Sequence, residues 1–520
     1  MSENLSRRDF IKLMASVPLM KLAMDMPGLS PINYSNQNPD LPNILILVFD
    51  ALSATNISLY GYHRQTMPNL ERFAEKSTVY NRHYAGGSFT SPGTASLLTG
   101  TYPWKNRAYH LYGTVTKQFE DRNLFSILSE KNFMRMSFTH NDLASMLLHQ
   151  FESDLELIKK TKDLCLVNEY LLADSIFQKD HNAAFLGERT ITRGQRGQGT
   201  QLPSSTFLSG LHRVWRDKSK NDVESQYRDL FPRGLPSTNA GPFVYLLEDA
   251  MDWVRDSVMN SAKPFLGYFH FLPPHEPYHT RKEFVRMFRD GWAPVSKPEH
   301  KFSGAVSEKD LQVKRRWYDE YIAYVDAEFG RLIDSLEQQG ILQNTNIIVT
   351  SDHGEMFERG ILEHITPTLF EPIARVPLVI HHPGQTKRED INIPTSAVDI
   401  LPTVNAMVGQ EVVTWSEGVA LPKTSSESTV DERNVFIMDA KSNPKNAPFT
   451  KGSVAMVKDN YKLIYYTGYD EFNDQFEMYD LINDLEELDD LYSESNTLAG
   501  DLKVELLTAL DEANKPYMVS

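Results

Sequence analysis

Continuous runs of branched and apolar residues, each ended by polar residues, recur along the chain. The first is Asn43–Phe49, which ends at Asp50, and similar runs cover residues 264–270, 346–350 and 376–381. Unbroken apolar runs of this length are typical of strands that are buried on both faces of a parallel sheet. We therefore expect these four segments to be the central strands of one sheet.

Segments with helical spacing lie between these runs. Residues 69–76 and 317–339 carry apolar positions three or four residues apart, and a further helix is expected to begin at Thr94 after the Pro92-Gly93 turn. The alternation predicts an α/β fold, a doubly wound and mostly parallel sheet flanked by helices. Ligands of such folds bind beyond the carboxyl ends of the strands, where Asp50, residues 270–275 and residues 352–353 fall.

The pattern changes after residue 430. Short strand-like runs follow closely at 434–438, 453–458, 461–466 and 475–479, and a helical pattern covers 498–513. We expect three regions: a leader and linker (1–42), a main domain (43–430) with a variable insertion at about 150–245, and a C-terminal subdomain of antiparallel sheet and helix (431–520). The GQRGQG run at 194–199 lacks the flanking strand and helix of a phosphate-binding loop, which favours a flexible insertion.

Composition and charge narrow the functions that this fold can carry. The chain has 520 residues, 53 Lys and Arg against 69 Asp and Glu, and a formal net charge of −16, which argues against a nucleic-acid partner. No apolar run reaches the roughly 18–20 residues of a membrane span. Cys165 is the only cysteine, which excludes an intramolecular disulfide and any multi-cysteine metal site. A metal would therefore be held by oxygen and histidine nitrogen.

The N-terminus carries a possible export signal. Arg7 and Arg8 precede a short apolar stretch at 13–20, in the manner of a twin-arginine signal. Lys21 interrupts that stretch and no A-x-A-like cleavage site follows it. We expect export to the periplasm or cell envelope; the alternative is a basic leader on a cytoplasmic protein.

An ordered series of motifs closely resembles the sulfatase branch of the alkaline phosphatase superfamily. The series runs through NILILVFDALSA (43–54), TSPGTASLLTGTYP (90–103), HFLPPHEPY (270–278), TSDHGE (350–355), LFEPIARVPLVIHHPG (369–384) and MYDLINDLEELDDLY (478–492). The resemblance covers nearly the whole chain outside the insertion. It implies the alkaline-phosphatase-like fold and an enzyme that cleaves or transfers an anionic ester.

The nucleophile motif departs from that family. Sulfatases of this branch carry C-x-P-x-R, whose cysteine or serine is oxidised to formylglycine, whereas Thr90 and Thr94 stand here at the first and last positions. Oxidation of threonine would give a ketone, and Cys165 lies outside any such motif, so formylglycine chemistry is not expected. A threonine here is similar to lipoteichoic acid synthases and phosphoethanolamine transferases, in which a metal-bound threonine attacks phosphorus. Thr90 is therefore the expected nucleophile.

The resemblance also implies one divalent metal ion. Its expected ligands are Asp50, Thr90, Asp352 and His353, and three oxygens with one imidazole favour Mn²⁺ or Zn²⁺, with Ca²⁺ as the alternative. Ala51 replaces the second of the paired aspartates found in formylglycine sulfatases, which removes a carboxylate that Ca²⁺ would use. His270 is expected to contact the ligands rather than the ion.

Five further residues are candidates for contact with the substrate. His275 and His364 match family positions that face the ester or its leaving group, and either imidazole could act as general acid. Lys105, His110 and Asn141 are expected to bind the substrate anion. Taken singly, Asp50 could be a helix cap and His275 a satisfied loop histidine. The order of Asp50, Thr90, Asp352 and His353 along the chain favours joint metal binding.

The sequence therefore predicts a metal-dependent hydrolase or transferase that cleaves an anionic ester through Thr90. Phosphoesters and phosphodiesters are favoured over sulfate esters, with a glycan or an envelope polymer among the candidate substrates. The alternatives are a sulfatase that works without formylglycine and a degenerate member that binds an anionic glycan without turnover. The leaving group, the acceptor and the oligomeric state are not given by the sequence.

Overall fold

The computed structural model describes residues 41–167, 218, 220–238, 243–427, 433–470 and 472–518. The twin-arginine segment, the GQRGQG run and most of the predicted insertion lie outside the described residues. Among the described helices, none combines the length and apolar character that crossing a bilayer requires.

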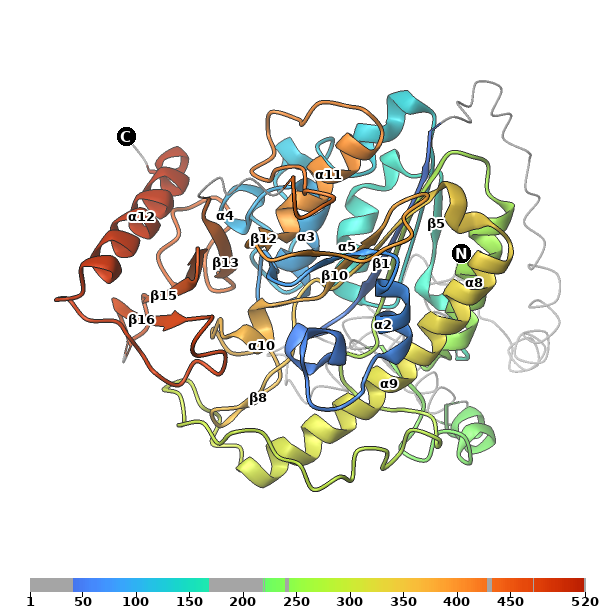
Figure 1. The fold of residues 1–520 in the computed structure, drawn as a ribbon, viewed down its shortest axis with the longest axis horizontal. Coiled ribbons are helices and arrows are strands. Elements are labelled where there is room, and N and C mark those ends of the chain that lie inside the picture. Colours follow the sequence, from blue (N-terminus) through green and yellow to red (C-terminus); the bar gives the residue numbers. More distant parts are fainter. Residues whose placement is uncertain are drawn as a thin grey trace, which may run out of the picture. The chain divides into compact units, whose positions relative to one another are not determined.

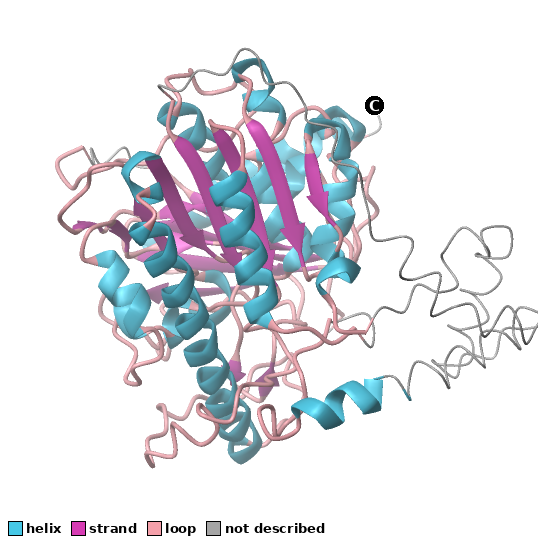
Figure 2. Ribbon diagram, turned by 90° about the vertical axis from the view of Figure 1, so that its right-hand side faces the viewer, coloured by secondary structure: helices cyan, strands magenta, loops and turns pink. Residues whose placement is uncertain are grey.

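Eight strands form the main sheet, in the order β11-β2-β10-β7-β1-β6-β4-β5. Figure 2 shows this sheet as magenta strands with helices packed beside it. Their bounds are β1 (Asn43–Phe49), β2 (Thr78–Tyr80), β4 (Met134–Thr139), β5 (Leu157–Lys159), β6 (Phe265–Phe271), β7 (Thr345–Thr350), β10 (Leu378–His381) and β11 (Glu389–Ile391). Neighbouring strands pair in parallel except at β10, which is antiparallel to both β7 and β2. The mostly parallel sheet is confirmed, and each of the four expected central strands begins and ends within two residues of its predicted bounds.

Helices cover both faces of this sheet, which explains why β1 is apolar at every position (Figure 1). Leu45, Leu47 and Phe49 pack in one buried cluster, and Ile44 and Ile46 pack in another. The first cluster includes residues of α2 (Pro68–Ala74), α8 (Leu247–Asn260) and α9 (Glu308–Gln338); the second includes α3 (Thr90–Thr99), α5 (Asp142–Gln150) and α11 (Ile400–Met407). Successive side chains of a strand point to opposite faces, so burial of both faces requires an unbroken apolar run.

Two predicted helices begin earlier than expected. The helix that we placed at Thr94 begins at Thr90, because Pro92 lies in its first turn, where a missing N–H costs no helical hydrogen bond. The helix predicted at 317–339 begins at Glu308, where the hydroxyl of Ser307 accepts a hydrogen bond from the N–H of Asp310. The first correction matters for function, since it moves the expected nucleophile to the first residue of a helix.

The C-terminal region forms the small antiparallel sheet that the sequence predicts. Its strands are β13 (Val435–Asp439), β14 (Gly452–Lys458), β15 (Tyr461–Thr467) and β16 (Gln475–Asp480), followed by α12 (Thr497–Asn514). Shorter elements are β3 (His83–Tyr84), β8 (Phe357–Glu358), β9 (Ile361–Leu362), β12 (Thr395–Ser396), α4 (Pro103–Asn106) and α10 (Glu371–Ala374). Tyr102 and Trp104 of the main domain share a buried cluster with Phe436 of β13, so the small sheet packs directly on the main domain.

Candidate active site

The site lies where four neighbouring strands end. β1 pairs with both β6 and β7, with Val48 opposite His270 on one side and opposite Thr350 on the other. β4 pairs with the far side of β6, with Thr139 opposite His270. Parallel strands end at the same edge of a sheet, so the segments that follow them converge there, as the sequence predicts.

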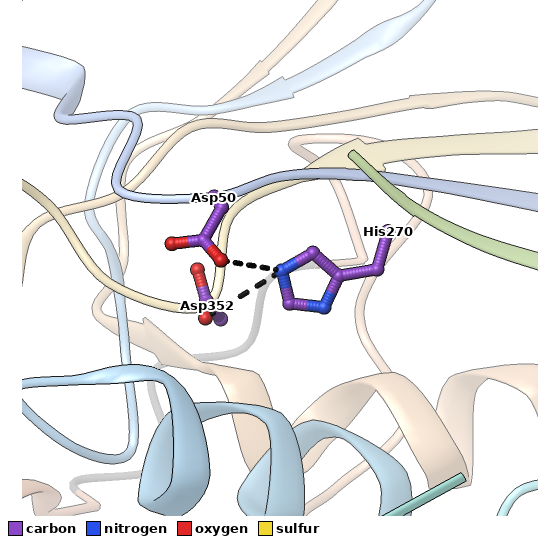
Figure 3. A group of neighbouring side chains, drawn as sticks. All are labelled: Asp50, His270 and Asp352. Atoms are coloured by element: carbon purple, nitrogen blue, oxygen red, sulfur yellow. Dashed lines mark hydrogen bonds and ion pairs between the residues drawn. The ribbon is translucent and has the colours of Figure 1, made fainter. Parts of the chain in front are cut away.

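Asp50, His270 and Asp352 come together at this edge, and all three are completely buried (Figure 3). Nε2 of His270 lies 3.2 Å from Oδ2 of Asp50 and 3.7 Å from Oδ2 of Asp352. One ligand atom from each residue lies within 4.8 Å of the others, as the ligands of a single ion would. Oδ1 of Asp50 and Oδ2 of Asp352 have no hydrogen-bond partner among the described residues. Buried carboxylate oxygens normally have a partner, so these atoms fit a bound cation.

His353 completes this group from the other side. Its Nδ1 lies 2.9 Å from the carbonyl oxygen of Gly354, and a carbonyl can only accept, so the proton of the neutral ring is held on Nδ1. Nε2 then faces the carboxylates, 3.4 Å from Oδ1 of Asp50 and 3.7 Å from Oδ2 of Asp352. The backbone therefore fixes the tautomer that a metal ligand requires.

The charges of the group follow from burial and proximity. Burial alone would lower the pKa of His353, but the carboxylates of Asp352 and Asp50 outweigh it and raise that pKa to about 9. Burial would likewise raise the pKa of Asp50, yet the adjacent imidazoles of His270 and His353 hold it well below its usual value. Burial and the negative charge of Asp50 raise the pKa of Asp352. Two adjacent buried carboxylates thus attract positive charge strongly, which a divalent cation would supply.

Thr90 reaches the group as the first residue of α3. Its Oγ1 lies 3.4 Å from Nε2 of His353. Gly93 explains the close approach, because a Cβ on this residue would lie 2.2 Å from the carbonyl oxygen of Asp352. The first-turn N–H groups of a helix have no partner within the helix, so this helix end also favours an anion at Thr90.

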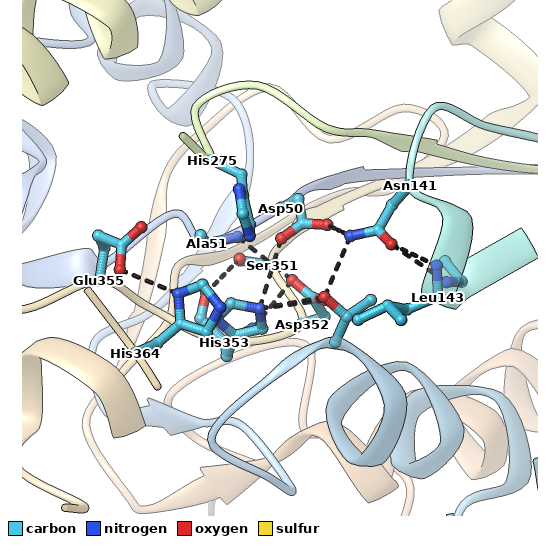
Figure 4. A network of polar contacts seen from close by, with 12 residues as sticks. Asp50, Ala51, Asn141, Leu143, His275, Ser351, Asp352, His353, Glu355 and His364 are labelled. Atoms are coloured by element: carbon cyan, nitrogen blue, oxygen red, sulfur yellow. Dashed lines mark hydrogen bonds and ion pairs between the residues drawn. The ribbon is translucent and has the colours of Figure 1, made fainter. Parts of the chain in front are cut away.

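Asn141 lies between Asp50 and the start of α5 (Figure 4). Its Oδ1 accepts hydrogen bonds from the N–H groups of Leu143, at 2.7 Å, and Ala144, at 3.3 Å, and so caps α5. The amide nitrogen must then face the opposite way, where it donates to Oγ1 of Thr90 at 3.1 Å and also to Oδ2 of Asp50. We expected Asn141 to bind the substrate, which stays a prediction; the structure shows that its amide also contacts Thr90, the expected nucleophile.

His275 and His364 lie together beside His353. The ring centroid of His364 is 4.3 Å from that of His353 and 4.9 Å from that of His275. Nδ1 of His275 lies 2.9 Å from the carbonyl oxygen of Glu276, which leaves Nε2 as its available nitrogen. Burial and the neighbouring His353 and His275 hold the pKa of His364 well below its usual value.

Glu355, which the sequence analysis did not single out, orients His364. One of its carboxylate oxygens lies 2.9 Å from Nδ1 of His364, and its side chain is completely buried. Burial raises the pKa of Glu355 to about 8. Its position two residues after His353, in the predicted TSDHGE motif, was the available signal, but an acidic residue after a strand is more often a solvated turn residue.

Two predicted substrate-binding residues do not join this group. Nζ of Lys105 donates to the carbonyl oxygen of Trp415 at 2.8 Å, and His110 is exposed. Neither contacts Thr90 or the carboxylates in the contacts found for the described residues. His140 also turns away, since its ring stacks on Tyr245 with centroids 3.8 Å apart.

Two family models match the chain. The model described as Sulfatase matches residues 42–156 and 205–409, which is more than half of the chain. The model described as N-sulphoglucosamine sulphohydrolase, C-terminal, matches residues 366–515. The second match covers all of the small antiparallel sheet.

Among characterised relatives, the chain is similar to a choline-sulfatase of Rhizobium meliloti, with 26% identity over 82% of this chain and 78% of the relative. It is also similar to an N-acetylglucosamine-6-O-sulfatase of Bacteroides thetaiotaomicron, with 23% identity over 98% of this chain and 93% of the relative. The solved structure of a phosphonate monoester hydrolase of Agrobacterium radiobacter superposes with a TM-score of 0.65 at 19% identity, covering 91% of this chain and 96% of that one. A second solved structure, of a protein in complex with its substrate D-glucosamine-2-N,6-O-disulfate, superposes with a TM-score of 0.62 at 19% identity, covering 92% of this chain and 98% of that one.

Proposed function

This chain belongs to the sulfatase family of ester hydrolases, and we propose that its Thr90 hydroxyl attacks an anionic ester, with phosphoesters and phosphodiesters preferred over sulfate esters. The observation that carries the proposal is the position of Oγ1 of Thr90, which lies 3.4 Å from Nε2 of His353 and accepts a hydrogen bond from Asn141. This hydroxyl occupies the place where formylglycine sulfatases carry their oxidised residue. A threonine cannot form that aldehyde, so we assign the attack to the Thr90 hydroxyl itself.

We propose that Asp50, Thr90, Asp352 and His353 hold one divalent cation, with Mn²⁺ or Zn²⁺ favoured. When bound, the cation would supply positive charge that stabilises the ionised hydroxyl and the ester oxygens. Binding would require His353 to be neutral, with its Nε2 proton and the hydroxyl proton of Thr90 lost to solvent. Asn141 meanwhile holds Oγ1 by donating to it, so that a lone pair of this oxygen is directed at the ester.

The proposed first step forms a bond between Oγ1 of Thr90 and phosphorus and breaks the bond to the leaving oxygen. We assign protonation of that leaving oxygen to His275, because its Nδ1–H is held by a carbonyl and Nε2 remains available. His364 is the weaker candidate, because burial and two neighbouring imidazoles disfavour its protonated form. In the second step the oxygen of water or of an acceptor hydroxyl bonds to phosphorus, and the bond between phosphorus and Oγ1 of Thr90 breaks, which releases the ionised Thr90 oxygen. The attacking group gives its proton to Nε2 of His275.

The competing proposal is a sulfatase that uses Thr90 directly on a sulfate ester. Its support is the printed activity of the relatives, a choline-sulfatase and an N-acetylglucosamine-6-O-sulfatase. A sulfated or otherwise anionic sugar is the substrate class that this version favours. A glycan-binding member without turnover has less support, because it gives no reason to keep the two carboxylates, His353 and Thr90 in contact.

The test compares wild type with Thr90→Ala and Thr90→Ser on matched aryl phosphate, phosphodiester, phosphonate and sulfate esters. Each assay is run with Mn²⁺, Zn²⁺ or Ca²⁺ after removal of bound metal. We expect the phosphorus esters to be preferred, Thr90→Ser to retain part of the activity, and Thr90→Ala to lose about 10³-fold or more in kcat/KM. A sulfate preference that survives Thr90→Ala would reject the Thr90 mechanism.

We also propose that the chain is exported, on the basis of Arg7 and Arg8. Expression with an epitope at the C-terminus, followed by cell fractionation of wild type and an Arg7→Lys, Arg8→Lys double variant, tests this. Equal amounts of both forms in the cytoplasmic fraction would reject export by this route.

A further inference from the structure

We infer that His270 is itself a ligand of the metal, so that two imidazoles and two carboxylates surround the ion and select Mn²⁺ or Zn²⁺ over Ca²⁺. This inference rests on the proposed function only in that a divalent cation binds between Asp50 and Asp352. It changes the role of His270 that the sequence suggested, which was to contact the ligands rather than the ion. It also changes which ions the site would accept.

The first argument is the equivalence of the two histidines. Nε2 of His270 and Nε2 of His353 both lie 3.7 Å from the same atom, Oδ2 of Asp352. They lie 3.2 Å and 3.4 Å from the two different carboxylate oxygens of Asp50. His270 therefore faces the carboxylate pair in the same way as His353, the histidine that stands in the family's ligand motif.

The second argument is the size of these separations. Neighbouring ligands of one ion with bonds of about 2.1 Å stand roughly 3.0–3.4 Å apart when they subtend about 90–110° at the ion. Two of the four imidazole-to-carboxylate distances, 3.2 and 3.4 Å, fall in this range, and the other two are 3.7 Å. Small movements would bring all four groups to one ion. A histidine that only supported Asp50 from behind would not also approach Asp352.

The third argument is that the buried carboxylate oxygens and the imidazole nitrogen facing the proposed ion are available to bind it. Oδ1 of Asp50 and Oδ2 of Asp352 are buried without a hydrogen-bond partner among the described residues. Nδ1 of His270 lies 3.4 Å from the hydroxyl of Tyr268, which can accept the ring proton and leave Nε2 with its lone pair. The Tyr268 hydroxyl can therefore hold the buried imidazole of His270 in the tautomer that a metal ligand requires.

The types of ligand atom then determine which ion the site would prefer. Ca²⁺ takes six to eight oxygen ligands, whereas Mn²⁺ and Zn²⁺ accept imidazole readily. Ala51 contributes no side-chain oxygen to such a ligand set. Two carboxylates also balance the charge of one divalent ion when both histidines are neutral.

The experiment counts imidazoles bound to Mn²⁺ by pulsed EPR of the full-length protein, using the hyperfine coupling to ¹⁴N. We expect two coupled imidazoles in wild type, one in His270→Ala, and two in His140→Ala. His140 is the matched control because it is equally buried at the end of the neighbouring strand, and its backbone N–H donates to the carbonyl oxygen of His270 at 3.2 Å. Its own ring stacks on Tyr245 and faces no carboxylate.

Isothermal titration calorimetry provides the second readout. We expect His270→Ala to weaken Mn²⁺ and Zn²⁺ binding by more than about 100-fold, beyond the roughly 10- to 100-fold loss that is usual when a residue that only supports a ligand is removed. Binding of Ca²⁺ should change far less. His270→Gln, whose amide oxygen preserves a polar side chain between the carboxylates, provides the same comparison if His270→Ala fails to fold.

The outcomes separate this inference from the proposed function. Wild type that binds one Mn²⁺ through a single imidazole, or that binds Ca²⁺ more tightly than Mn²⁺, overturns the role of His270 and leaves the Thr90 mechanism standing. Unchanged Mn²⁺ affinity in both His270→Ala and His270→Gln overturns it as well. Wild type that binds no stoichiometric metal contradicts both proposals.

Discussion

Asn141 provides the sharpest test of how the nucleophile is held, because its two ends have separable tasks. Its carbonyl oxygen caps α5 through Leu143 and Ala144, and its amide nitrogen donates to Thr90 and Asp50. Serine is as good a helix cap as asparagine but is too short to serve both ends. Asn141→Ser therefore removes the contact with the nucleophile and keeps the cap, whereas Asn141→Ala removes both.

The expected magnitudes follow from these contacts. Loss of the cap costs about 1 kcal/mol, so Asn141→Ala should be less stable than Asn141→Ser by roughly that amount in urea unfolding. The bonds to Thr90 and to the charged Asp50 are worth about 1.5–3 kcal/mol, which corresponds to roughly 10- to 100-fold in rate. We expect both variants to lose kcat/KM by this factor on the preferred aryl ester.

The assay is a paired measurement of kcat/KM and of the free energy of unfolding for wild type and both variants. Equal losses of activity with unequal losses of stability would support the division of tasks. If Asn141→Ser keeps kcat/KM within about twofold of wild type, the amide does not position Thr90. If the two variants are equally stable, the cap contributes less than the two N–H bonds indicate.

Three further predictions concern protons and packing. The carboxylates of Asp352 and Asp50 outweigh burial and raise the pKa of His353 to about 9, so Mn²⁺ must displace a proton from this residue when it binds. Calorimetry should therefore show that Mn²⁺ affinity rises by up to about tenfold per pH unit below pH 9. An affinity that does not change from pH 6 to 9 contradicts this prediction. Burial raises the pKa of Glu355 to about 8 from an ordinary 4.5, so the folded state keeps a proton that the unfolded state has lost. The metal-free protein should therefore lose stability as pH rises from about 4.5 to 8, and Glu355→Gln should flatten that slope in urea unfolding; an unchanged slope rejects the assignment. Gly93→Ala should lower the free energy of unfolding by about 1–3 kcal/mol and weaken Mn²⁺ binding, because the added Cβ would lie 2.2 Å from the carbonyl oxygen of Asp352. Gly500→Ala is the control, because its added Cβ would meet no atom within 4 Å, and it should not lower the stability measured by thermal unfolding.

Most of the fold could be predicted from local patterns. The unbroken apolar run Asn43–Phe49 requires two covered faces, and the observed clusters on either side of β1 are those faces. The start of a helix is harder to predict where a residue is common both in turns and in the first turn of a helix. Pro92 marks a turn in many sequences, yet it also fits the first turn of a helix, and only the contact between Gly93 and Asp352 shows which applies here.

The candidate site divides in the same way. The order of Asp50, Thr90, Asp352 and His353 along the chain predicts a joint role, because residues at the carboxyl ends of parallel strands converge. The sequence could not give the environment of His270, which depends on the register between β1 and β6. Nor could it show that Lys105 faces the carbonyl of Trp415, since that contact joins segments about 310 residues apart.

The sequence alone thus determined the layers of the fold, the strand ends at which the candidate site lies, and the presence of Thr90 at the expected nucleophile position. These properties follow from the local spacing of apolar residues and from the identity of single residues. The tertiary structure decided which side chains face one another: two histidines against one pair of carboxylates, and an asparagine amide against the nucleophile. Such contacts depend on strand register and on close helix packing, and sequence spacing does not encode either distance.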